Sequence, residues 1–327
     1  MKYMKYLIFL LGVLFFFSCG NDKEYKEFRL AYAMAQGSLP HGAAEKFASL
    51  VEERSAGKIK VKLYPNGILG NERILTESIN LRSVDMIITG TSIIGFYIPE
   101  YTAFDAPFIF RDYEHLEKVL NGEIGDEIKS ALYEKRKIHI LSFFFRGPRY
   151  MTTTNRIVRT PDDMRGLKLR VPEHPVYIKS WRIFGANPTP LAFSDMFMAL
   201  KQGVVNGQEN PLEVVYSSHL YETQKYVIKT DHLLSCYFAS VGDYFYKKFD
   251  EKEQKLLKDA IIEASHYQNE LMMQYEDEYI KKLIEAGIEF IDDVDREAFE
   301  DLALEKLPTI FKNVWSPNIY QRIRNVK

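Results

Sequence analysis

Residues 28–67 read FRLAYAMAQGSLPHGAAEKFASLVEERSAGKIKVKLYPNG. Large apolar side chains occupy every second position over residues 28–34 and again over residues 59–63, which predicts two strands. Between them, apolar residues from Ala43 to Val51 follow helical spacing. Tyr64-Pro65-Asn66-Gly67 is a turn signal that ends the second strand. The stretch therefore predicts a strand, a helix and a second strand.

The same alternation of strands and helices continues on the C-terminal side. Residues 72–81 predict a helix and residues 85–89 a buried strand, which completes the β-α-β-α-β opening of a parallel sheet. A further apolar strand is expected at 138–145. A second set starts near Gly147, and its predicted elements are a strand at 167–171, a helix at 176–184, an extended segment at 188–191 and a helix at 194–200. The fold class is therefore α/β, organised in two halves.

A long helix is predicted late in the chain. Asp250 can cap it, and Glu253 completes a capping-box pattern. Helical spacing then continues to Gly287, a natural C-terminal stop. Such a helix has about 36 residues and a length of roughly 54 Å, so it should run along both halves as a spine. Two helices broken near Ser265-His266 are the alternative, which is disfavoured because no Gly or Pro interrupts the run.

The N-terminus has the pattern of an export signal. Two lysines precede the apolar run 7–17, and Ser18-Cys19-Gly20 follows it. We expect residues 1–18 to be a lipoprotein signal peptide, Cys19 to be the acylated first residue of the mature chain, and 19–27 to be a tether. A plain secretory signal, with Cys19 incidental, is the alternative.

Composition excludes several classes of function. The 327 residues suggest about two domains, and 43 Lys+Arg against 45 Asp+Glu leave no basic excess for nucleic acid. The two cysteines, Cys19 and Cys236, cannot form a disulfide framework or a four-cysteine metal site, and Cys236 is expected to be a buried thiol. No nucleophile elbow, zinc-protease, P-loop or dinucleotide motif occurs, so neither an enzyme nor a cofactor is expected.

Three polar side chains stand in otherwise apolar, rigid settings. Arg149 follows the strand 138–145 and the turn Gly147-Pro148, Arg170 ends the strand 167–171, and Asn210 precedes a proline. A guanidinium can hold a carboxylate through two parallel hydrogen bonds, and burying its charge is costly unless an anion meets it. An internal salt bridge is the alternative for each arginine, and a backbone-capping turn is the alternative for Asn210.

The chain resembles the substrate-binding proteins of tripartite ATP-independent periplasmic (TRAP) transporters. An ordered set of short motifs carries this resemblance over nearly the whole mature chain: Gly57-Lys58-Ile59, Tyr64-Pro65-Asn66-Gly67-Ile68-Leu69-Gly70, Val84-Asp85-Met86, Gly147-Pro148-Arg149-Tyr150-Met151-Thr152, Gly166-Leu167-Lys168-Leu169-Arg170-Val171-Pro172, Pro188-Thr189-Pro190 with Phe193-Ser194, and Asn206-Gly207-Gln208-Glu209-Asn210-Pro211.

The resemblance implies a two-domain periplasmic-binding-protein fold that closes on one organic acid in a cleft between the domains. Residues 28–146 with 235–270 are expected to form domain I, residues 147–234 with 288–327 domain II, and residues 250–287 the helix along both. It implies a periplasmic protein that delivers its ligand to the membrane subunits of a TRAP transporter.

The resemblance also assigns roles to individual residues. It makes Arg170 the main carboxylate clamp, Arg149 a second arginine near the ligand, Asn210 a ligand contact and Phe193 the aromatic residue that packs on the substrate. Further candidates for ligand contact are Glu173, Tyr237, Thr91 and Arg146. A rim salt bridge for Glu173, a core position for Tyr237 and a solvated side chain for Arg146 are the alternatives.

Substrate identity is less sharply defined. Sialic-acid-binding members have Glu-Ser after the strand that matches 85–88, whereas this chain has Thr89-Gly90-Thr91, which disfavours sialic acid. Glu173, Thr91 and Asn210 could bind hydroxyl groups, which favours a sugar acid, such as a hexuronate or aldonate, over a C4-dicarboxylate. Two alternatives outside transport are an extracytoplasmic enzyme acting on an acid sugar and a binding module that serves a sensor or scavenger.

Overall fold

The computed structural model describes residues 25–327. The predicted signal peptide and Cys19 lie outside this range, so both stay predictions. The predicted tether ends earlier than expected, because Lys26 already belongs to the first strand and pairs in register with Ile59. Backbone pairing from Lys26 onward thus orders residues whose polar composition suggested a linker.

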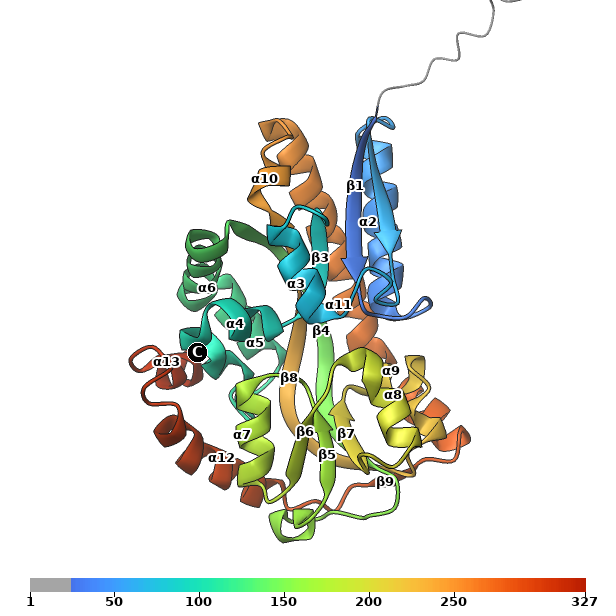
Figure 1. The fold of residues 1–327 in the computed structure, drawn as a ribbon, viewed down its shortest axis with the longest axis vertical. Helices are drawn as coiled ribbons and strands as arrows, with labels where there is room; N and C mark the ends of the chain where they lie inside the picture. The colour runs from blue at the N-terminus through green and yellow to red at the C-terminus, as the bar shows by residue number, and fades with distance from the viewer. Residues whose placement is uncertain (1–24) are drawn as a thin grey trace, which may run out of the picture.

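The first half of the chain folds as the sequence predicts (Figure 1). Its first elements are β1 (Lys26–Tyr32), α2 (Leu39–Arg54), β2 (Ile59–Tyr64), α3 (Glu72–Asn80) and β3 (Met86–Gly90). Strand β1 pairs in parallel with both β2 and β3. The chain then adds α4 (Ser92–Tyr97), the 3-10 helix η1 (Pro99–Asp105), α5 (Tyr113–Asn121) and α6 (Glu123–Arg136). We refer to β1 through α6 as the first half.

Two long antiparallel strands, β4 (Ile138–Thr153) and β8 (Tyr226–Gly242), connect the two halves. The predicted strand end at residue 145, followed by a turn at Gly147-Pro148, is therefore wrong. The register shifts between Phe145 and Gly147, whose φ is +82°, so the glycine forms a β-bulge and the strand continues. Arg149 consequently lies within a strand, and the bend redirects β4 from one half into the other.

The second half repeats the α/β pattern. Its elements are the 3-10 helix η2 (Pro161–Met164), β5 (Lys168–Val171), α7 (Pro175–Ile183), β6 (Asn187–Pro190), α8 (Phe193–Lys201), β7 (Gly207–Asn210), α9 (Leu212–Ser217) and the 3-10 helix η3 (Leu220–Glu222). We refer to η2 through η3 as the second half. The strand order is β2-β1-β3-β8-β4-β7-β5-β6, with β9 (Glu289–Ile291) beside β8, so one sheet passes through both halves.

Helix α11 (Glu251–Glu285), which follows the short α10 (Asp243–Tyr246), confirms the predicted spine. The Asp250 side chain accepts a hydrogen bond from the Glu253 backbone N–H, and the Glu253 side chain accepts one from Asp250 in return. The helix has 35 residues without a break, and Gly287 follows its end with a φ of +92°. It packs against α2 in the first half and α9 in the second, which ties the two halves together.

The C-terminal segment does not stay with one half, in contrast to the assignment of residues 288–327 to domain II. Helix α12 (Arg296–Ile310) packs on α7 of the second half, whereas α13 (Ile319–Asn325) packs on η1 of the first. Arg322 on α13 forms an ion pair with Glu127 on α6. The chain thus returns to the first half, because α13 buries Ile319 and Ile323 there.

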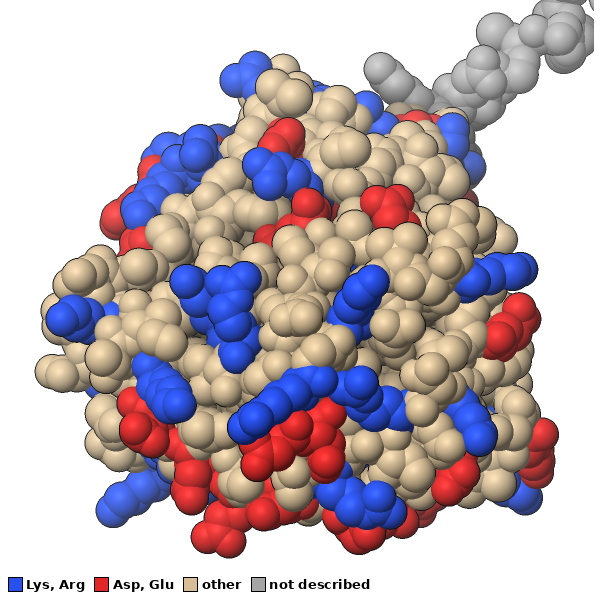
Figure 2. Space-filling model, turned by 60° about the horizontal axis from the view of Figure 1, so that its bottom comes forward, with Lys and Arg blue, Asp and Glu red and all other residues tan. Residues whose placement is uncertain are grey.

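Buried apolar side chains line both faces of the sheet, and Cys236 is among them as a fully buried free thiol. The sequence predicts this burial, which raises the pKa of the thiol well above its usual value and disfavours the reactive thiolate. On the face seen in Figure 2, basic and acidic side chains are interspersed among uncharged ones. Within residues 25–327, none of the helices combines the length and apolar character needed to cross a membrane.

Candidate functional site

A cavity between the two halves collects most of the polar residues singled out in the sequence. It occupies about 530 Å³, counting its open mouth, and its walls come from α3 and α4 of the first half and from β4, β5, α8 and β7. The predicted residues on these walls are Arg146, Arg149, Arg170, Glu173, Phe193 and Asn210. Residues that are scattered over the sequence therefore share one cavity.

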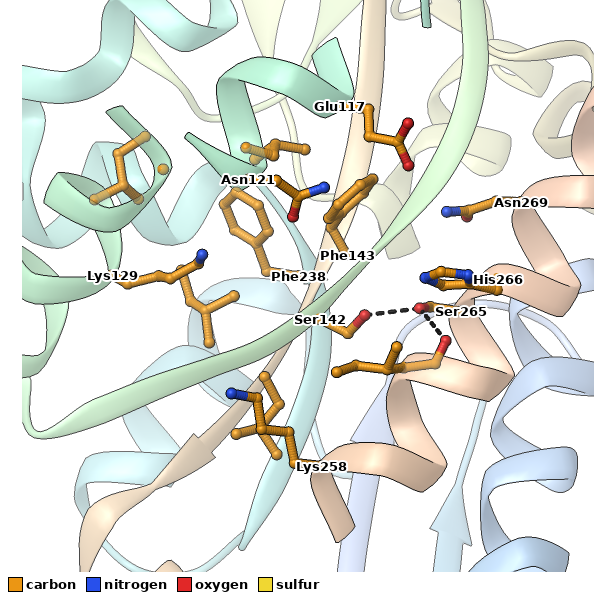
Figure 3. Close-up of a pocket in the computed structure, with 16 residues that line it drawn as sticks. Glu117, Asn121, Lys129, Ser142, Phe143, Phe238, Lys258, Ser265, His266 and Asn269 are labelled. Atoms are coloured by element: carbon orange, nitrogen blue, oxygen red, sulfur yellow. Dashed lines mark hydrogen bonds between the residues drawn. The ribbon is translucent and has the colours of Figure 1, made fainter. Parts of the chain in front are cut away.

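A second cavity, between α6, β4 and α11, has different chemistry (Figure 3). It occupies about 870 Å³, likewise counting its open mouth, and its walls include Phe143 and Phe238 beside Lys129 and Lys258. It contains no guanidinium, and its Ser142 hydroxyl is hydrogen-bonded to another wall residue. We therefore place the candidate site in the arginine-lined cavity.

Arg170 is a buried cation without an acidic partner. Its side chain is 3% exposed, and its Nε and Nη2 both donate to the Leu191 carbonyl oxygen, at 3.0 and 2.7 Å. No carboxylate of residues 25–327 lies within ion-pair distance of it. Burial lowers the pKa of Arg170 to about 10, which reflects the cost of holding this charge away from water. The guanidinium faces the cavity and can form an ion pair with an anion there.

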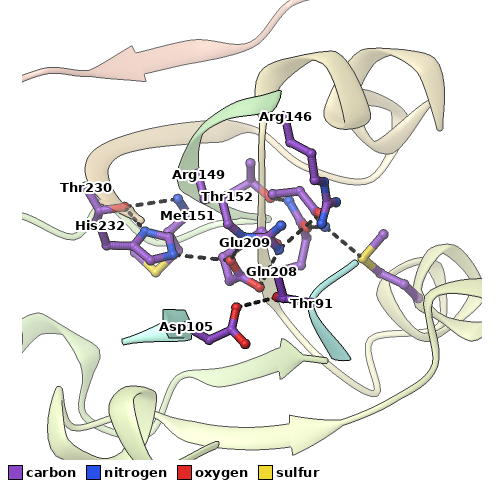
Figure 4. Close-up of polar contacts among 12 residues, drawn as sticks. Thr91, Asp105, Arg146, Arg149, Met151, Thr152, Gln208, Glu209, Thr230 and His232 are labelled. Atoms are coloured by element: carbon purple, nitrogen blue, oxygen red, sulfur yellow. Dashed lines mark hydrogen bonds and ion pairs between the residues drawn. The ribbon is translucent and has the colours of Figure 1, made fainter. Parts of the chain in front are cut away.

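Arg149, in contrast, is neutralised by the protein itself (Figure 4). Its Nε donates to Glu209 Oε2 at 2.5 Å and its Nη2 to Glu209 Oε1 at 2.8 Å. Strand pairing of β4 with β7 produces this contact, because Tyr150 is in register with Asn210 and Met151 with Glu209. The internal salt bridge weighed as an alternative is therefore present, and only the buried Nη1 of Arg149 has no partner among the described residues.

His232 completes this buried cluster. Burial lowers the pKa of His232, so the ring is neutral and its Nε2–H donates to Glu209 Oε2 at 3.2 Å, while Nδ1 accepts from the Thr230 hydroxyl at 2.9 Å. Burial by itself would raise the pKa of Glu209, but the Arg149 charge and the hydrogen bonds from His232 and Arg149 lower it to about 2. Glu209 is thus a permanent carboxylate that holds Arg149 in place.

Asn210 and Arg146 extend the polar wall. The Asn210 Oδ1 accepts from Arg149 at 3.1 Å and from Arg146 at 3.3 Å, while its Nδ2 donates to Gln208 Oε1 at 2.6 Å. The Arg146 guanidinium stacks on the Tyr237 ring, 4.1 Å from its centroid. Arg146 and Asn210 line the cavity, whereas Tyr237 supports Arg146 from behind.

The remaining predicted residues divide between the wall and the interior. Phe193, the first residue of α8, and Glu173, which follows β5, line the cavity. Thr91 does not line it, because the Thr91 hydroxyl donates to the buried Asp105 carboxylate.

The sequence analysis missed the contribution of α3 and α4. Glu72 lies on the cavity wall, where its carboxylate accepts hydrogen bonds from the Gly90 backbone N–H at 2.9 Å and from the Ser92 hydroxyl at 3.1 Å. Arg73 and Phe96 line the mouth, with the guanidinium carbon 5.3 Å from the ring centroid. No local signal marks these residues, because an acidic residue in the first turn of a helix is common for structural reasons.

Comparison with known proteins identifies the family of this chain. The family model for bacterial extracellular solute-binding protein, family 7 (DctP), matches residues 30–313. The 2,3-diketo-L-gulonate-binding periplasmic protein YiaO of Escherichia coli K12 is 32% identical over 301 residues, which cover 92% of this chain and 91% of YiaO.

Solved structures show the same fold. The TRAP periplasmic solute-binding protein of Roseobacter denitrificans with bound L-galactonate has a TM-score of 0.86 and 33% identity, covering 93% of this chain and 99% of that one. The protein of a Polaromonas species bound to D-erythronate has a TM-score of 0.87 and 30% identity, covering 92% and 99%. Such proteins bind solutes outside the cytoplasm for membrane transporters and are not enzymes. The chain therefore belongs to family 7 of the bacterial extracellular solute-binding proteins, the DctP-type proteins of TRAP transporters.

Proposed function

We propose that this protein binds a sugar acid with one carboxylate, such as a hexuronate or aldonate, and delivers it to the membrane subunits of a TRAP transporter. One observation carries the proposal: Arg170 is a buried guanidinium that faces the cavity and has no acidic partner of its own. A bound carboxylate would compensate this charge through hydrogen bonds of the charge-assisted kind. The binding of acids by similar proteins supports this choice.

The charges around the cavity favour one carboxylate over two. Arg149 is already paired with Glu209, whereas the Arg146 guanidinium donates to the Asn210 side chain and lies over the Tyr237 ring. Arg170 and Arg146 have no acidic partner within ion-pair distance among residues 25–327, but the carboxylates of Glu72 and Glu173 stand on the same walls. The second carboxylate of a C4-dicarboxylate would share the cavity with the carboxylates of Glu72 and Glu173. Like charges repel, so this second group would weaken binding.

The other wall groups suit hydroxyls. The carboxylates of Glu72 and Glu173 accept hydrogen bonds, which sugar hydroxyls can donate. Phe193 adds an apolar surface on which a carbon chain or ring can pack. An acid with a hydroxylated chain would therefore use both the positive and the negative groups of the cavity.

The proposed mechanism is binding with hinge closure and no turnover. The carboxylate meets Arg170 in the second half, and hydroxyls reach Glu72 in the first half. Because one ligand then contacts both halves, it binds the closed form better than the open form and shifts the population toward it. The closed, loaded protein is the form that would dock on the transporter.

A thermal-shift screen tests this function. The compounds are D-glucuronate, L-galactonate, D-erythronate, succinate and sialic acid. A ligand at 100 times its dissociation constant adds about 2.7 kcal/mol of stability, so the correct acid will raise the melting temperature clearly. We expect the hexuronate or the aldonates to stabilise the protein, and succinate and sialic acid to have little effect. Stabilisation by succinate alone would contradict the proposal.

Glu72→Gln is expected to change selectivity rather than abolish binding. The amide keeps one acceptor but loses the charge, so sugar-acid affinity should fall roughly ten-fold, within the range for a hydrogen bond to a charged group. Succinate binding should be unchanged or improve, because a repelling charge is gone. Calorimetric titration gives the dissociation constants of the sugar acid and of succinate, and their ratio measures the selectivity. Glu52→Gln on α2 is the control. An equal loss for both acids would argue against the assigned role.

We also infer that Cys19 carries a lipid that anchors the exported protein to a membrane, as the signal pattern before it suggests. In cells given labelled palmitate, the wild-type protein should incorporate the label and sediment with membranes. Cys19→Ser should remain unlabelled and appear in the soluble fraction. An unlabelled wild-type protein would favour the plain secretory signal.

A further inference from the structure

Two buried titratable side chains from different halves approach each other where the chain leaves β5, the strand that carries Arg170. Asp105, the last residue of η1 in the first half, is 2% exposed, and His174, the residue that caps α7 in the second half, is 1% exposed. Asp105 Oδ2 lies 3.3 Å from His174 Nε2. This contact belongs neither to the Arg149–Glu209–His232 cluster nor to the cavity wall.

The neighbours of this pair define which atom donates. The backbone N–H of Val176 donates to His174 Nδ1 at 3.3 Å, so in the neutral ring the proton is on Nε2, which faces Asp105. Burial lowers the pKa of His174, which agrees with a neutral ring. The Thr91 hydroxyl donates to the other oxygen of Asp105, Oδ1. Asp105 Oδ2 and His174 Nε2 are both buried and face each other at 3.3 Å, yet neither has an aligned hydrogen-bond partner among residues 25–327.

The first half is shaped to receive the imidazole. A Cβ atom on Gly95 of α4 would lie 2.5 Å from His174 Nε2, so the ring approaches the α4 backbone more closely than any side chain at position 95 would permit. The Tyr177 ring packs edge-on against His174 from the other side, at 5.6 Å between centroids. The ring therefore fits closely against the first half, and a small further movement of the halves would bring its Nε2–H into line with Asp105 Oδ2.

We propose that Asp105 and His174 form a latch between the two halves, which makes closure of the cleft more favourable. When the halves separate, water can solvate the carboxylate and the imidazole. When they close, both polar groups are desolvated, and that cost is offset only if the Nε2–H reaches Asp105. His174 comes four residues after Arg170, so the latch would hold the clamp strand against the first half.

Two substitutions separate the latch from helix capping. His174→Asn keeps a good N-cap for α7, but its side chain is too short to reach Asp105. Asp105→Asn keeps an oxygen for Thr91 but presents an N–H to the His174 N–H. Each variant is expected to weaken binding of the acid found in the screen by roughly ten-fold, within the usual range of coupling between sites. In the double variant the losses should not add, because both remove the same contact. His219→Asn, an exposed histidine of the same half, is the matched control.

The latch can also be measured without a ligand, which separates it from the proposed function. Spin labels on Glu52→Cys and Lys179→Cys, in a Cys19→Ser background, report the distance between the halves. We expect His174→Asn to shift the ligand-free population toward longer distances and His219→Asn to leave it unchanged. The latch would be overturned if His174→Asn showed the same distances as the wild type and the losses of affinity in His174→Asn and Asp105→Asn added in the double variant. A failure of every acid to bind would refute the proposed substrate class but not this result.

Discussion

Replacing Arg170 with glutamine is expected to weaken sugar-acid binding by roughly 100-fold or more. Truncating one partner of a buried charge pair costs about 2–5 kcal/mol, and about 1.4 kcal/mol corresponds to a factor of ten. The effect should be large because Arg149 is already paired with Glu209, which leaves only Arg146 of the described wall residues to compensate the carboxylate. Calorimetric titration with the acid identified by the screen measures the change in dissociation constant.

The same substitution should not destabilise the ligand-free protein. Arg170 contributes a buried charge whose only hydrogen bonds go to the Leu191 carbonyl, so its removal relieves a desolvation cost. We therefore expect an equal or higher melting temperature without ligand. Arg182→Gln, on the exposed surface of α7, is the control and should change neither quantity. A lower melting temperature with unchanged affinity would make Arg170 a structural residue rather than a clamp.

Replacing Glu209 with glutamine should have the opposite signature, a large loss of stability. Glu209 compensates the fully buried Arg149 charge and accepts a hydrogen bond from His232. Removing one partner of a buried ion pair leaves an uncompensated charge and costs about 3–5 kcal/mol. Urea unfolding followed by circular dichroism measures the difference from wild type, and Glu222→Gln, an exposed acid of the same half, should show almost none.

The stability difference between wild type and Glu209→Gln should also depend on pH. The folded-state pKa of Glu209 is about 2, below its ordinary value of 4.5, so its stabilising contribution is complete above about pH 4.5. As the pH falls from 4.5 toward 2, the unfolded state takes up the proton first and the difference shrinks. A difference that stays constant over this range would show that the carboxylate charge does not stabilise the fold.

Local sequence patterns were sufficient for much of the architecture. Alternation over residues 28–34 and 59–63 predicts β1 and β2, because successive side chains of a strand point to opposite faces of the sheet. The capping pair Asp250 and Glu253 predicts where α11 begins, since both partners lie within one helical turn. The ordered motifs identified the family, which the comparisons confirm.

The same patterns failed where the outcome depends on pairing between distant segments. Gly147-Pro148 has the composition of a turn, but pairing with β8 carries β4 through it as a bulge. The return of α13 to the first half depends on apolar surface that only the folded molecule presents.

The sequence by itself determined the α/β class and the spine helix, because these follow from interactions within a few residues, and it marked Arg149 and Arg170 as arginines in apolar surroundings. Only the tertiary structure decided which of the two, Arg149 or Arg170, lacks an acidic partner. Glu209 lies 60 residues from Arg149, and the register of β7 against β4 brings them together, so one guanidinium is neutralised while Arg170 remains uncompensated. Charge compensation depends on distance in space, and strand register sets that distance.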